Sequence, residues 1–555
     1  MPGRSAESWW RSGVIYQIYV RSFADDNGDG IGDIAGIRSR LDYLHRLGID
    51  AIWVTPWYSS PLADGGYDIA DYRAIDPNFG DLSEAESLIS EALGMGIRTI
   101  IDVVPNHVSY RHPWFEEALA SPAGSPQRSR FWFHPGKGES GEEIPTRWVS
   151  SFAGETWTRT VTDAGEAGEW YLHLFTPQQP DLNWSHPQVR SEHEDVLRFW
   201  FDRGVAGIRI DSAALLVKDP ELPEVTDDPT LGHHPYTDRD ELHDIYRSWR
   251  RIADSYQPPR ILVGEIWLDD AERFSAYLRP DEMHTAFNFD FMSQPWDAAR
   301  LRASIESTLD AHSLVGAPAT WVLSNHDVTR PVTRYGREDS SFLFATKRFG
   351  IATDLSRGRR RARAAALLIG ALPGTLYIYQ GDELGLPEVE DLPLGAIQDP
   401  MHFRSGGVDP GRDGCRVPLP WSGGEPPFGF SSGAGVKTWL PQPLPWGELT
   451  VEHQEEDVRS FLSLYRTMLD LRRSLPALGR TDLHWFSDDT NVVAFSRGDG
   501  FACVVNLGAE PIALPIHDEV LLASDVIDDG MLAPDVAVWL RLLAGDATRT
   551  HRSGA

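Results

Sequence analysis

The chain has 555 residues, of which 41% are hydrophobic and 24% charged, enough for a large globular core with an accessory domain. Its two cysteines, Cys415 and Cys503, are too few for a disulfide framework, and the sequence has no Cys/His cluster of the zinc-binding kind. A formal net charge of -31 argues against nucleic-acid partners, because a phosphate-binding surface needs clustered Lys and Arg.

The first residues, MPGRSAESWWRSG, contain no apolar run typical of a signal peptide. No later segment offers about 18 uninterrupted apolar residues for a membrane span. We therefore expect a cytoplasmic protein with no membrane partner, and the sequence leaves its oligomeric state open.

Apolar strand-like runs alternate with amphipathic helical stretches along most of the chain. Between the first two runs, apolar residues recur at helical spacing over 37–47, and Gly48 supplies a stop. This repeated order predicts parallel strands covered by helices, and eight such units favour a closed (β/α)8 barrel of the α/β class. The expected strands are 14–20, 51–54, 99–104, 205–210, 261–263, 285–289, 321–323 and 376–379. The other expected helices lie near 83–94, 187–203, 239–256, 298–312 and 358–371.

Two regions interrupt this order. Residues 106–176 are rich in Trp and Gly and carry no barrel helix, which predicts a domain inserted after the third strand. Residues 381–452 carry many Pro and Gly and predict a loop-rich, lid-like excursion after the eighth strand. Short alternating runs at 492–495 and 501–505 indicate a small antiparallel β domain. The predicted domains are the barrel at 1–105 and 177–475, the inserted domain at 106–176 and the C-terminal β domain at 476–555.

Charged residues gather where the expected strands end. Asp102 ends the third strand, Arg209 and Asp211 end the fourth, Glu265 the fifth and Asp327 the seventh. In a barrel, the strand-to-helix loops build one open face, so these side chains should converge. Crowded carboxylates raise one another's pKa, a cost more expected at a site that uses them than at a structural one.

The residue types at this face suit the cleavage of glycosidic bonds. Residues two apart on a strand point the same way, so the Arg209 guanidinium can orient the Asp211 carboxylate and hold it ionised as a nucleophile. Glu265 follows an apolar run, and partial burial would raise its pKa, as a general acid needs near neutral pH. One ionised and one protonated carboxyl group across a gap is the arrangement that glycoside hydrolysis uses.

Seven motifs, which follow one another along the chain in the family's order, resemble those of the α-amylase family, glycoside hydrolase family 13. Four resemble its strand-end motifs: DVVPNH at 102–107, GIRID at 207–211, GEIW at 264–267 and SNHD at 324–327. Three resemble further family motifs: GVIYQIYVRSF at 13–23, QPDLNW at 179–184 and YQGDELG at 379–385. The resemblance spans nearly the whole chain. It implies a (β/α)8 TIM barrel with an inserted B domain after strand 3 and a C-terminal antiparallel β-sandwich domain.

The same resemblance implies a role for each matching residue. Asp211 would be the nucleophile that forms a covalent β-glucosyl intermediate, and Glu265 would act first as acid and then as base. Asp327 would help to distort the sugar and bind its ring hydroxyls, while His107 and His326 would hydrogen-bond the same sugar. The anomeric configuration would be retained overall.

A closer resemblance is to the α-glucosidase and oligo-1,6-glucosidase branch. DGGYDIADY at 64–72 resembles the branch motif DNGYDI, so Asp64 and Tyr67 are expected at the closed end of a pocket. GRDGCRVPLPW at 411–421 resembles the loop that supplies an arginine, here Arg412, to pair with Asp64. Such a pair would block the pocket behind one glucose unit and impose cleavage from the non-reducing end. The further residues expected to line this pocket are Phe152, Phe175 and Gln179.

The residue after the predicted nucleophile, Ser212, bears on linkage, because relatives that cleave α-1,6 bonds tend to have Val there. The prediction is therefore a retaining exo-acting α-glucosidase that releases α-glucose from short oligosaccharides, α-1,4-linked as in maltose. One alternative is a transglucosylase or a sucrose or maltose isomerase, since the covalent intermediate can pass to a sugar hydroxyl. Another is a non-catalytic subunit of a transporter, although such chains carry a membrane anchor or lack the catalytic acids.

The segment DDNGDGIGD at 25–33 sets oxygen-bearing side chains at alternate positions with glycines between them. Hard oxygen ligands at this density suit calcium. An EF-hand loop would need Glu at its twelfth position, where this chain has glycine, so that interpretation fails. Branch relatives carry a calcium ion here with a backbone carbonyl as a further ligand, which implies structural calcium, with magnesium or a solvated acidic turn as alternatives. The expected ligands are Asp25, Asn27, Asp29, Ile31 and Asp33.

Overall fold

The computed structural model describes residues 7–161, 165–226, 234–344, 350–433, 435–498 and 500–543. Parts of the predicted domains therefore lie outside the described residues: the start of the barrel at 1–6, three residues of the inserted domain, two barrel segments at 227–233 and 345–349, one residue of the excursion, and 499 and 544–555 of the C-terminal domain.

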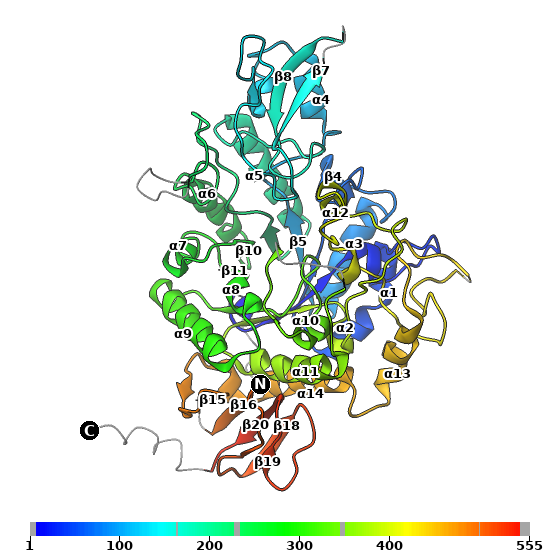
Figure 1. Cartoon of the computed structure of the whole chain (residues 1–555), viewed down its shortest axis with the longest axis vertical. Helices are drawn as coiled ribbons and strands as arrows, with labels where there is room; N and C mark the ends of the chain where they lie inside the picture. Colours follow the sequence, from blue (N-terminus) through cyan, green and yellow to red (C-terminus); the bar gives the residue numbers. More distant parts are fainter. Residues whose placement is uncertain are drawn as a thin grey trace.

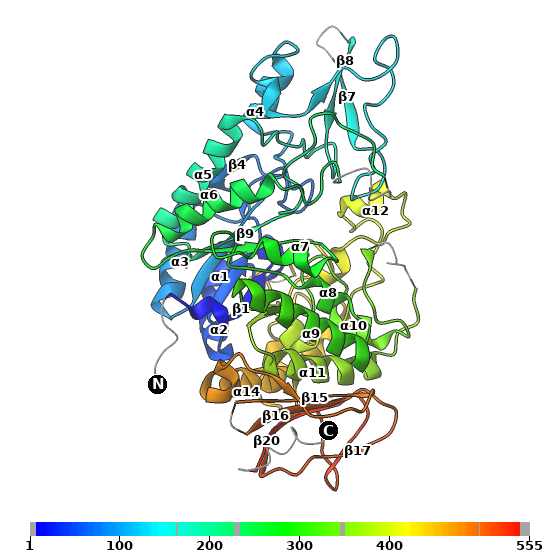
Figure 2. The same ribbon diagram turned by 90° about the vertical axis from the view of Figure 1, so that its left-hand side faces the viewer.

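Eight strands form one parallel sheet that curves into a near-closed barrel (Figures 1 and 2). Their order, β11-β10-β9-β5-β2-β1-β13-β12, follows the chain around the ring, and the neighbouring strands pair in parallel. The strands are β1 (Val14–Ile18), β2 (Ala51–Val54), β5 (Arg98–Val103), β9 (Gly207–Ile210), β10 (Ile261–Gly264), β11 (Thr285–Ala286), β12 (Thr320–Trp321) and β13 (Thr375–Tyr379). The predicted α/β barrel is confirmed, and its strand ends share one face.

Helices cover the outside of the barrel (Figure 1). α3 begins at a capping box in which Asp81 and Glu84 satisfy each other's backbone N–H groups. The helices are α1 (Ile34–Ser39), α2 (Leu41–Leu47), α3 (Leu82–Gly94), α5 (Pro187–Asp202), α6 (Leu242–Asp254), α7 (Ala271–Ala276), α8 (Phe289–Ser293), α9 (Ala298–Val315), α10 (Pro331–Gly336), α11 (Leu355–Ala371) and α14 (Phe461–Ser474). The structure has helices at each of the six predicted stretches, and it adds α7, α8, α10 and α14, which the sequence did not predict. In the part of the chain that the structure describes, no helix is both long and apolar enough to cross a membrane.

Several element boundaries differ from the prediction. The expected strand 285–289 stops after two residues because the Asn288 side chain accepts the N–H of Phe291 and starts α8. The expected helix 37–47 is two helices, since the backbone at Arg40 leaves helical geometry. Gly48, at φ 92°, ends α2 as predicted, because only glycine adopts this left-handed conformation without cost.

The segment between β5 and α5 carries its own small sheet, far from the C-terminal end of the molecule (Figures 1 and 2). Three antiparallel strands, β6 (Phe133–His134), β8 (Ala167–Leu172) and β7 (Trp157–Val161), follow α4 (Pro113–Ala120). Trp148, Trp157, Leu172 and Leu174 form a separate buried cluster there. The inserted antiparallel sheet is thus confirmed, while the domain boundaries stay predictions. In its described residues, the excursion after β13 forms short helices, among them α12 (Pro400–Arg404) and α13 (Val451–Glu455).

The C-terminal residues form an antiparallel sheet that packs beneath α11 and α14 (Figure 2). Alternate residues of a strand face opposite sides, so Phe495 and Trp539 face the barrel helices while Val504 and Val538 face a second apolar cluster. The indole N–H of Trp539 donates to the Leu367 carbonyl of α11 at 3.0 Å. The sheet has the order β14 (His484–Trp485), β15 (Val492–Arg497), β16 (Phe501–Asn506), β20 (Val536–Arg541) and β18 (Glu519–Ala523), with a separate pair of β17 (Ile512–Ala513) and β19 (Met531–Leu532). The predicted antiparallel C-terminal domain is confirmed.

Candidate active site

The carboxyl ends of neighbouring strands bring three acids onto one arginine. Asp102 lies in β5 and Arg209 in β9, and the parallel register places them side by side. One terminal nitrogen of Arg209 donates to Asp102 Oδ1 at 2.6 Å and to Asp211 Oδ1 at 2.7 Å. The other terminal nitrogen lies 2.7 Å from the Oε2 atom of Glu265, the first residue after β10. A single buried guanidinium therefore holds all three acids in one cluster.

Burial changes the protonation of the two acids nearest the barrel mouth. Asp211 and Glu265 are 7% and 9% exposed. Desolvation raises the pKa of Asp211 above its ordinary value, and the Arg209 guanidinium opposes that rise. Desolvation also raises the pKa of Glu265, to about 7, with Arg209 again opposing it. Near neutral pH the pair can therefore hold one ionised and one protonated carboxyl group, as displacement at a glycosidic carbon requires.

Ser212 touches both of these carboxyl groups. Its backbone N–H donates to Glu265 Oε2 at 3.0 Å, and its hydroxyl donates to Asp211 Oδ2 at 2.9 Å. Its φ of 48° lies in the left-handed region, which is uncommon for a residue with a side chain and recurs at functional sites. The residue after the predicted nucleophile thus helps to set the relative position of the two acids.

Asp327, in the loop after β12, is held by two arginines. Arg416 donates to its Oδ1 atom at 2.7 Å and Arg412 donates to the same atom at 3.1 Å. Burial alone would raise the pKa of Asp327, yet the charged Arg412 and Arg416 beside it hold that pKa well below its ordinary value. Burial also lowers the pKa of His326 far below its ordinary value, so the imidazole is neutral at pH 7 and the guanidinium groups keep Asp327 ionised.

The far end of the site is closed by a chain of buried contacts. Arg412 donates to Asp64 Oδ1 at 2.6 Å, and Gln179 donates to Asp64 Oδ2 at 3.0 Å. His107 Nε2 lies 3.1 Å from Gln179 Nε2 and 3.0 Å from the Tyr67 carbonyl oxygen. Burial raises the pKa of Asp64 to about 6, and Arg412 opposes the rise. The loops after β2 and β13 therefore meet in one ion pair.

A cavity of about 460 Å³ lies at the barrel mouth. The predicted residues that line it are Asp64, Tyr67, Phe152, Phe175, Asp211, Glu265, His326, Asp327 and Arg412. Three others, His107, Gln179 and Arg209, lie behind its wall, each at most 1% exposed and in contact with a lining residue. The predicted catalytic and pocket residues therefore lie together at this cavity. Nine of them line it, and these three contact the lining residues from behind. Contact of His107 or Gln179 with a substrate stays a prediction.

Sequence reasoning did not single out several residues of the site. Arg416, which contacts Asp327, stands four positions after Arg412 in the quoted GRDGCRVPLPW motif, so that motif could have indicated it. Asp399, whose Oδ2 atom accepts from Arg412 Nε at 2.8 Å, belongs to none of the motifs. Ser212, which the sequence analysis considered for linkage, also lines the cavity. The further lining residues are Ser151, Ala214, Leu215, Tyr236, Thr237, Trp267, Phe344 and Met401.

The predicted metal loop binds its own backbone. Both side-chain oxygens of Asp25 accept glycine N–H groups of the loop, at 2.7 and 2.8 Å, and those of Asp33 also accept backbone N–H groups. Both oxygens of Asp25 and the Oδ1 atom of Asp33 keep a further lone pair, whereas Oδ2 of Asp33 already accepts two N–H groups. These three oxygens remain available to a hard cation, so the chemistry of this donor set fits one. Among the residues described, no group of three or more His, Cys, Asp and Glu could hold a metal ion. An ion here would need Asn27 and the Ile31 carbonyl as well as Asp29, and calcium stays a prediction.

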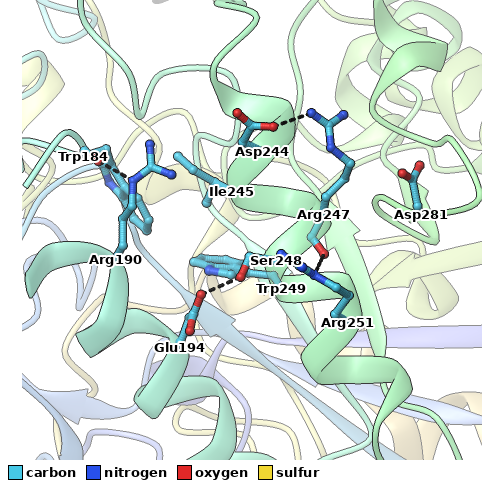
Figure 3. Close-up of a pocket in the computed structure, with 10 residues that line it drawn as sticks. All are labelled: Trp184, Arg190, Glu194, Asp244, Ile245, Arg247, Ser248, Trp249, Arg251 and Asp281. Atoms are coloured by element: carbon cyan, nitrogen blue, oxygen red, sulfur yellow. Dashed lines mark hydrogen bonds and ion pairs between the residues drawn. The ribbon is translucent and has the colours of Figure 1, made fainter. Parts of the chain in front are cut away.

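A second hollow of about 530 Å³ lies on the outer wall of the barrel, between α5 and α6 (Figure 3). Most of the charged side chains that line it already have partners within it. A terminal nitrogen of Arg247 lies 2.5 Å from Asp244 Oδ1, Ser248 donates to Glu194 at 2.5 Å, and Arg190 and Arg251 donate to backbone carbonyls. The strand-end acids lie elsewhere, so we place the candidate active site at the barrel mouth.

The chain matches the family model of the alpha-amylase catalytic domain over residues 17–480. The chain belongs to the alpha-amylase family. It is 34% identical to the "Probable alpha-glucosidase" of Rhizobium meliloti (strain 1021), with 90% of each chain covered. It is 33% identical to the oligo-1,6-glucosidase of Parageobacillus thermoglucosidasius, with 88% of each covered. The solved structure of the isomaltulose synthase PalI from Klebsiella sp. LX3 covers 96% of this chain and 99% of its own, with 32% identity and a TM-score of 0.83.

Within the alpha-amylase family the chain falls in the α-glucosidase and oligo-1,6-glucosidase subgroup, as the branch motifs predicted. It is therefore a glycoside hydrolase of the α-glucosidase type. The names of these relatives describe different bonds. Membership of the family therefore does not determine which glycosidic linkage this protein cleaves or which acceptor it uses.

Proposed function

We propose that this protein is a retaining exo-acting α-glucosidase that releases α-glucose from the non-reducing end of short α-1,4-linked oligosaccharides such as maltose. The observation that carries the proposal is the shared contact of Arg209 with Asp211 and Glu265, 2.7 Å to each. Both carboxyl groups lie against the same cavity, and burial raises the pKa of Glu265 to about 7, which supports Asp211 as nucleophile and Glu265 as acid.

The reaction would proceed by double displacement. Asp211 attacks the anomeric carbon while the glycosidic C–O bond breaks, and the departing oxygen takes the proton of Glu265. Glu265, now ionised, removes a proton from water, whose oxygen attacks the same carbon and breaks the bond to Asp211. Two inversions retain the α configuration, and Glu265 is protonated again at the end.

The closed end of the cavity supports cleavage of one glucose at a time. Asp64 and Arg412 lie 2.6 Å apart and are buried, so a sugar chain cannot continue past them. An ionised Asp327 beside this pair offers acceptor oxygens to sugar hydroxyls. The pocket thus suits the terminal unit of a neutral oligosaccharide.

Ser212 supports the α-1,4 preference, because it is a small hydroxyl residue where α-1,6-acting relatives tend to have Val. One side chain of this kind shifts such a preference by about 1–3 kcal/mol. The cytoplasmic compartment predicted from the sequence also stays a proposal.

Glucosyl transfer to a sugar hydroxyl is the second candidate function. It is favoured by the similarity to a solved isomaltulose synthase and by the aromatic residues Tyr236, Trp267 and Phe344, which line the cavity and offer flat surfaces to a sugar acceptor. The presence of Asp211, Glu265 and Asp327 at one cavity favours catalysis over a purely transporter-associated role.

The deciding experiment is product analysis by NMR of the purified protein given maltose, followed from the earliest time points. Asp211→Asn should be inactive, and Asp42→Asn, on the exposed face of α2, should behave as wild type. α-Glucose as the first product supports the glucosidase. New disaccharides or trisaccharides at modest maltose concentration identify a glucosyl-transferring enzyme. No reaction with maltose, isomaltose or sucrose would contradict both.

A further inference from the structure

Trp267, two residues after Glu265, combines an exposed ring with close stacking on a buried one. It is 37% exposed, whereas the strand that precedes it is buried. Its ring stacks on Phe289, the first residue of α8, with centroids 3.6 Å apart and an interplanar angle of 9°. Trp267 lines the cavity and Phe289, 4% exposed, does not, so the indole faces the cavity and Phe289 supports it from behind.

The same indole contacts the carboxyl group of Glu265. Its N–H donates to Glu265 Oε1 at 3.1 Å. The other oxygen, Oε2, has two donors of its own, a terminal nitrogen of Arg209 at 2.7 Å and the Ser212 N–H at 3.0 Å. A proton on Oε2 would face these donors, so the proton of the neutral acid belongs on Oε1. Trp267 is thus the side chain that contacts the oxygen which carries the proton.

We propose that Trp267 is a positioning residue that orients the proton of Glu265 on Oε1 toward the departing oxygen and forms the platform on which the leaving group lies. The proposal rests on the proposed function. The platform is flat and apolar, and it suits leaving groups with a flat apolar side, such as an aryl ring or the less polar face of a hexose. The same group would bind there as an acceptor when glucose is transferred.

Through Trp267, binding of the leaving group and its protonation depend on the same side chain. The indole would contact the leaving group with its ring and Glu265 Oε1 with its N–H. The departing oxygen and the proton on Oε1 are therefore kept close to each other. In the step itself, the O–H bond of Glu265 breaks, the glycosidic C–O bond breaks, and the departing oxygen keeps the bonding electrons and gains the proton. Phe344, with its ring 5.3 Å from that of Trp267, borders the platform.

The test compares leaving groups that need an acid with those that do not. Trp267→Phe keeps an aromatic ring to stack on Phe289, removes the N–H donor and makes the flat surface smaller. We expect kcat/KM for maltose to fall about tenfold or more, a part of the about 10²–10⁴-fold that general acid catalysis supplies. For p-nitrophenyl α-glucoside, whose leaving group departs without a proton, the fall should stay below about threefold. Trp485→Phe, in the C-terminal sheet, is the matched control and should change neither value.

The pH profile is the second readout. Wild type and Trp267→Phe share the other groups that face Glu265, so only the indole donor differs. These groups are Arg209, Asp211, Ser212 and Asp327. A donor to the carboxylate favours its ionised form, and its loss in Trp267→Phe should raise the pKa of Glu265 and move the alkaline limb of kcat/KM to higher pH.

The losses for the two substrates and the position of the alkaline limb together decide whether Trp267 positions Glu265. Unequal losses for the two substrates together with a shifted alkaline limb support the proposal. Equal losses, or an unmoved limb, would show that Trp267 only packs and would overturn it while leaving the proposed function intact. A wild-type protein that hydrolyses neither substrate would refute the proposed function and this inference with it. Trp267→Ala should in addition raise KM for maltose, because the platform itself is gone.

Discussion

The guanidinium of Arg412 lies 2.6 Å from Asp64 Oδ1 and also contacts Asp327 at 3.1 Å and Asp399 at 2.8 Å. One side chain from the excursion after β13 therefore ties together the loops after β2 and β12 at the closed end of the cavity. Because it is buried, removal of its charge leaves acids without their counter-ion.

We expect Arg412→Ala to lower kcat/KM for maltose strongly. Truncating one partner of a buried charge pair costs about 2–5 kcal/mol, which is about 30-fold to several thousand-fold in rate. Arg337→Ala is the matched control, since Arg337 pairs with Glu390 outside the cavity and should change kcat/KM less than about threefold. Steady-state kinetics on maltose decide the point, and similar losses in the two variants would contradict the assigned role of Arg412.

The pH dependence follows from the two carboxyl groups on Arg209. Glu265 must be protonated to donate, and its pKa is raised to about 7, so kcat/KM for maltose should fall as pH rises through 7. Asp211 must be ionised, and burial raises its pKa, so the acid limb should lie above the ordinary range of an aspartate. The profile of kcat/KM between about pH 4 and 9 measures both limbs.

Glu265→Gln provides the control for this profile. It should be nearly inactive on maltose, yet retain hydrolysis of p-nitrophenyl α-glucoside sufficient for a profile, and that profile should have no alkaline limb. An alkaline limb that persists in Glu265→Gln would assign it to another group.

The sequence predicted the barrel and the cluster of acids well because both depend on local patterns. A strand followed by a helix fixes where a strand end lies, and parallel strands bring Asp211 and Glu265 to one mouth. The contacts of Asp399 and Arg416 depend instead on how a long, aperiodic loop folds back across the barrel, which no spacing rule describes. The end of the expected strand at 285–289 was misplaced because a side-chain cap outweighed an apolar run.

The calcium proposal predicts a thermal shift. Added Ca²⁺ should raise the melting temperature relative to chelator, because a ligand that binds only the folded state stabilises it. Asp29→Ala removes one proposed ligand and should abolish the shift, while Asp26→Ala, exposed in the same loop and not a proposed ligand, should keep it. Calorimetry with Ca²⁺, Mg²⁺ and chelator measures this. No shift in wild type with either ion would favour the solvated turn.

Lys218 and Asp181 form a buried ion pair behind the cavity wall. Lys218 Nζ lies 2.8 Å from Asp181 Oδ2 and donates to Asn106 Oδ1 at 2.6 Å, and both charged side chains of the pair are fully buried. Lys218→Met should lower the free energy of unfolding by about 3–5 kcal/mol, because it leaves the buried Asp181 carboxylate without its counter-ion.

Lys137 offers a matched comparison for this pair. It lies 3.5 Å from Glu224, and both of those side chains are about half exposed, at 54% and 48%. Lys137→Met should therefore change stability by only about 0–1 kcal/mol, since water screens an exposed pair. Removing both partners in Lys218→Met with Asp181→Leu should recover part of the loss, because no charge is then left in the interior. Melting temperatures of the four proteins, wild type included, measure the difference. Equal values for Lys218→Met and Lys137→Met would mean that Asp181 finds another partner or takes up a proton once Lys218 is gone.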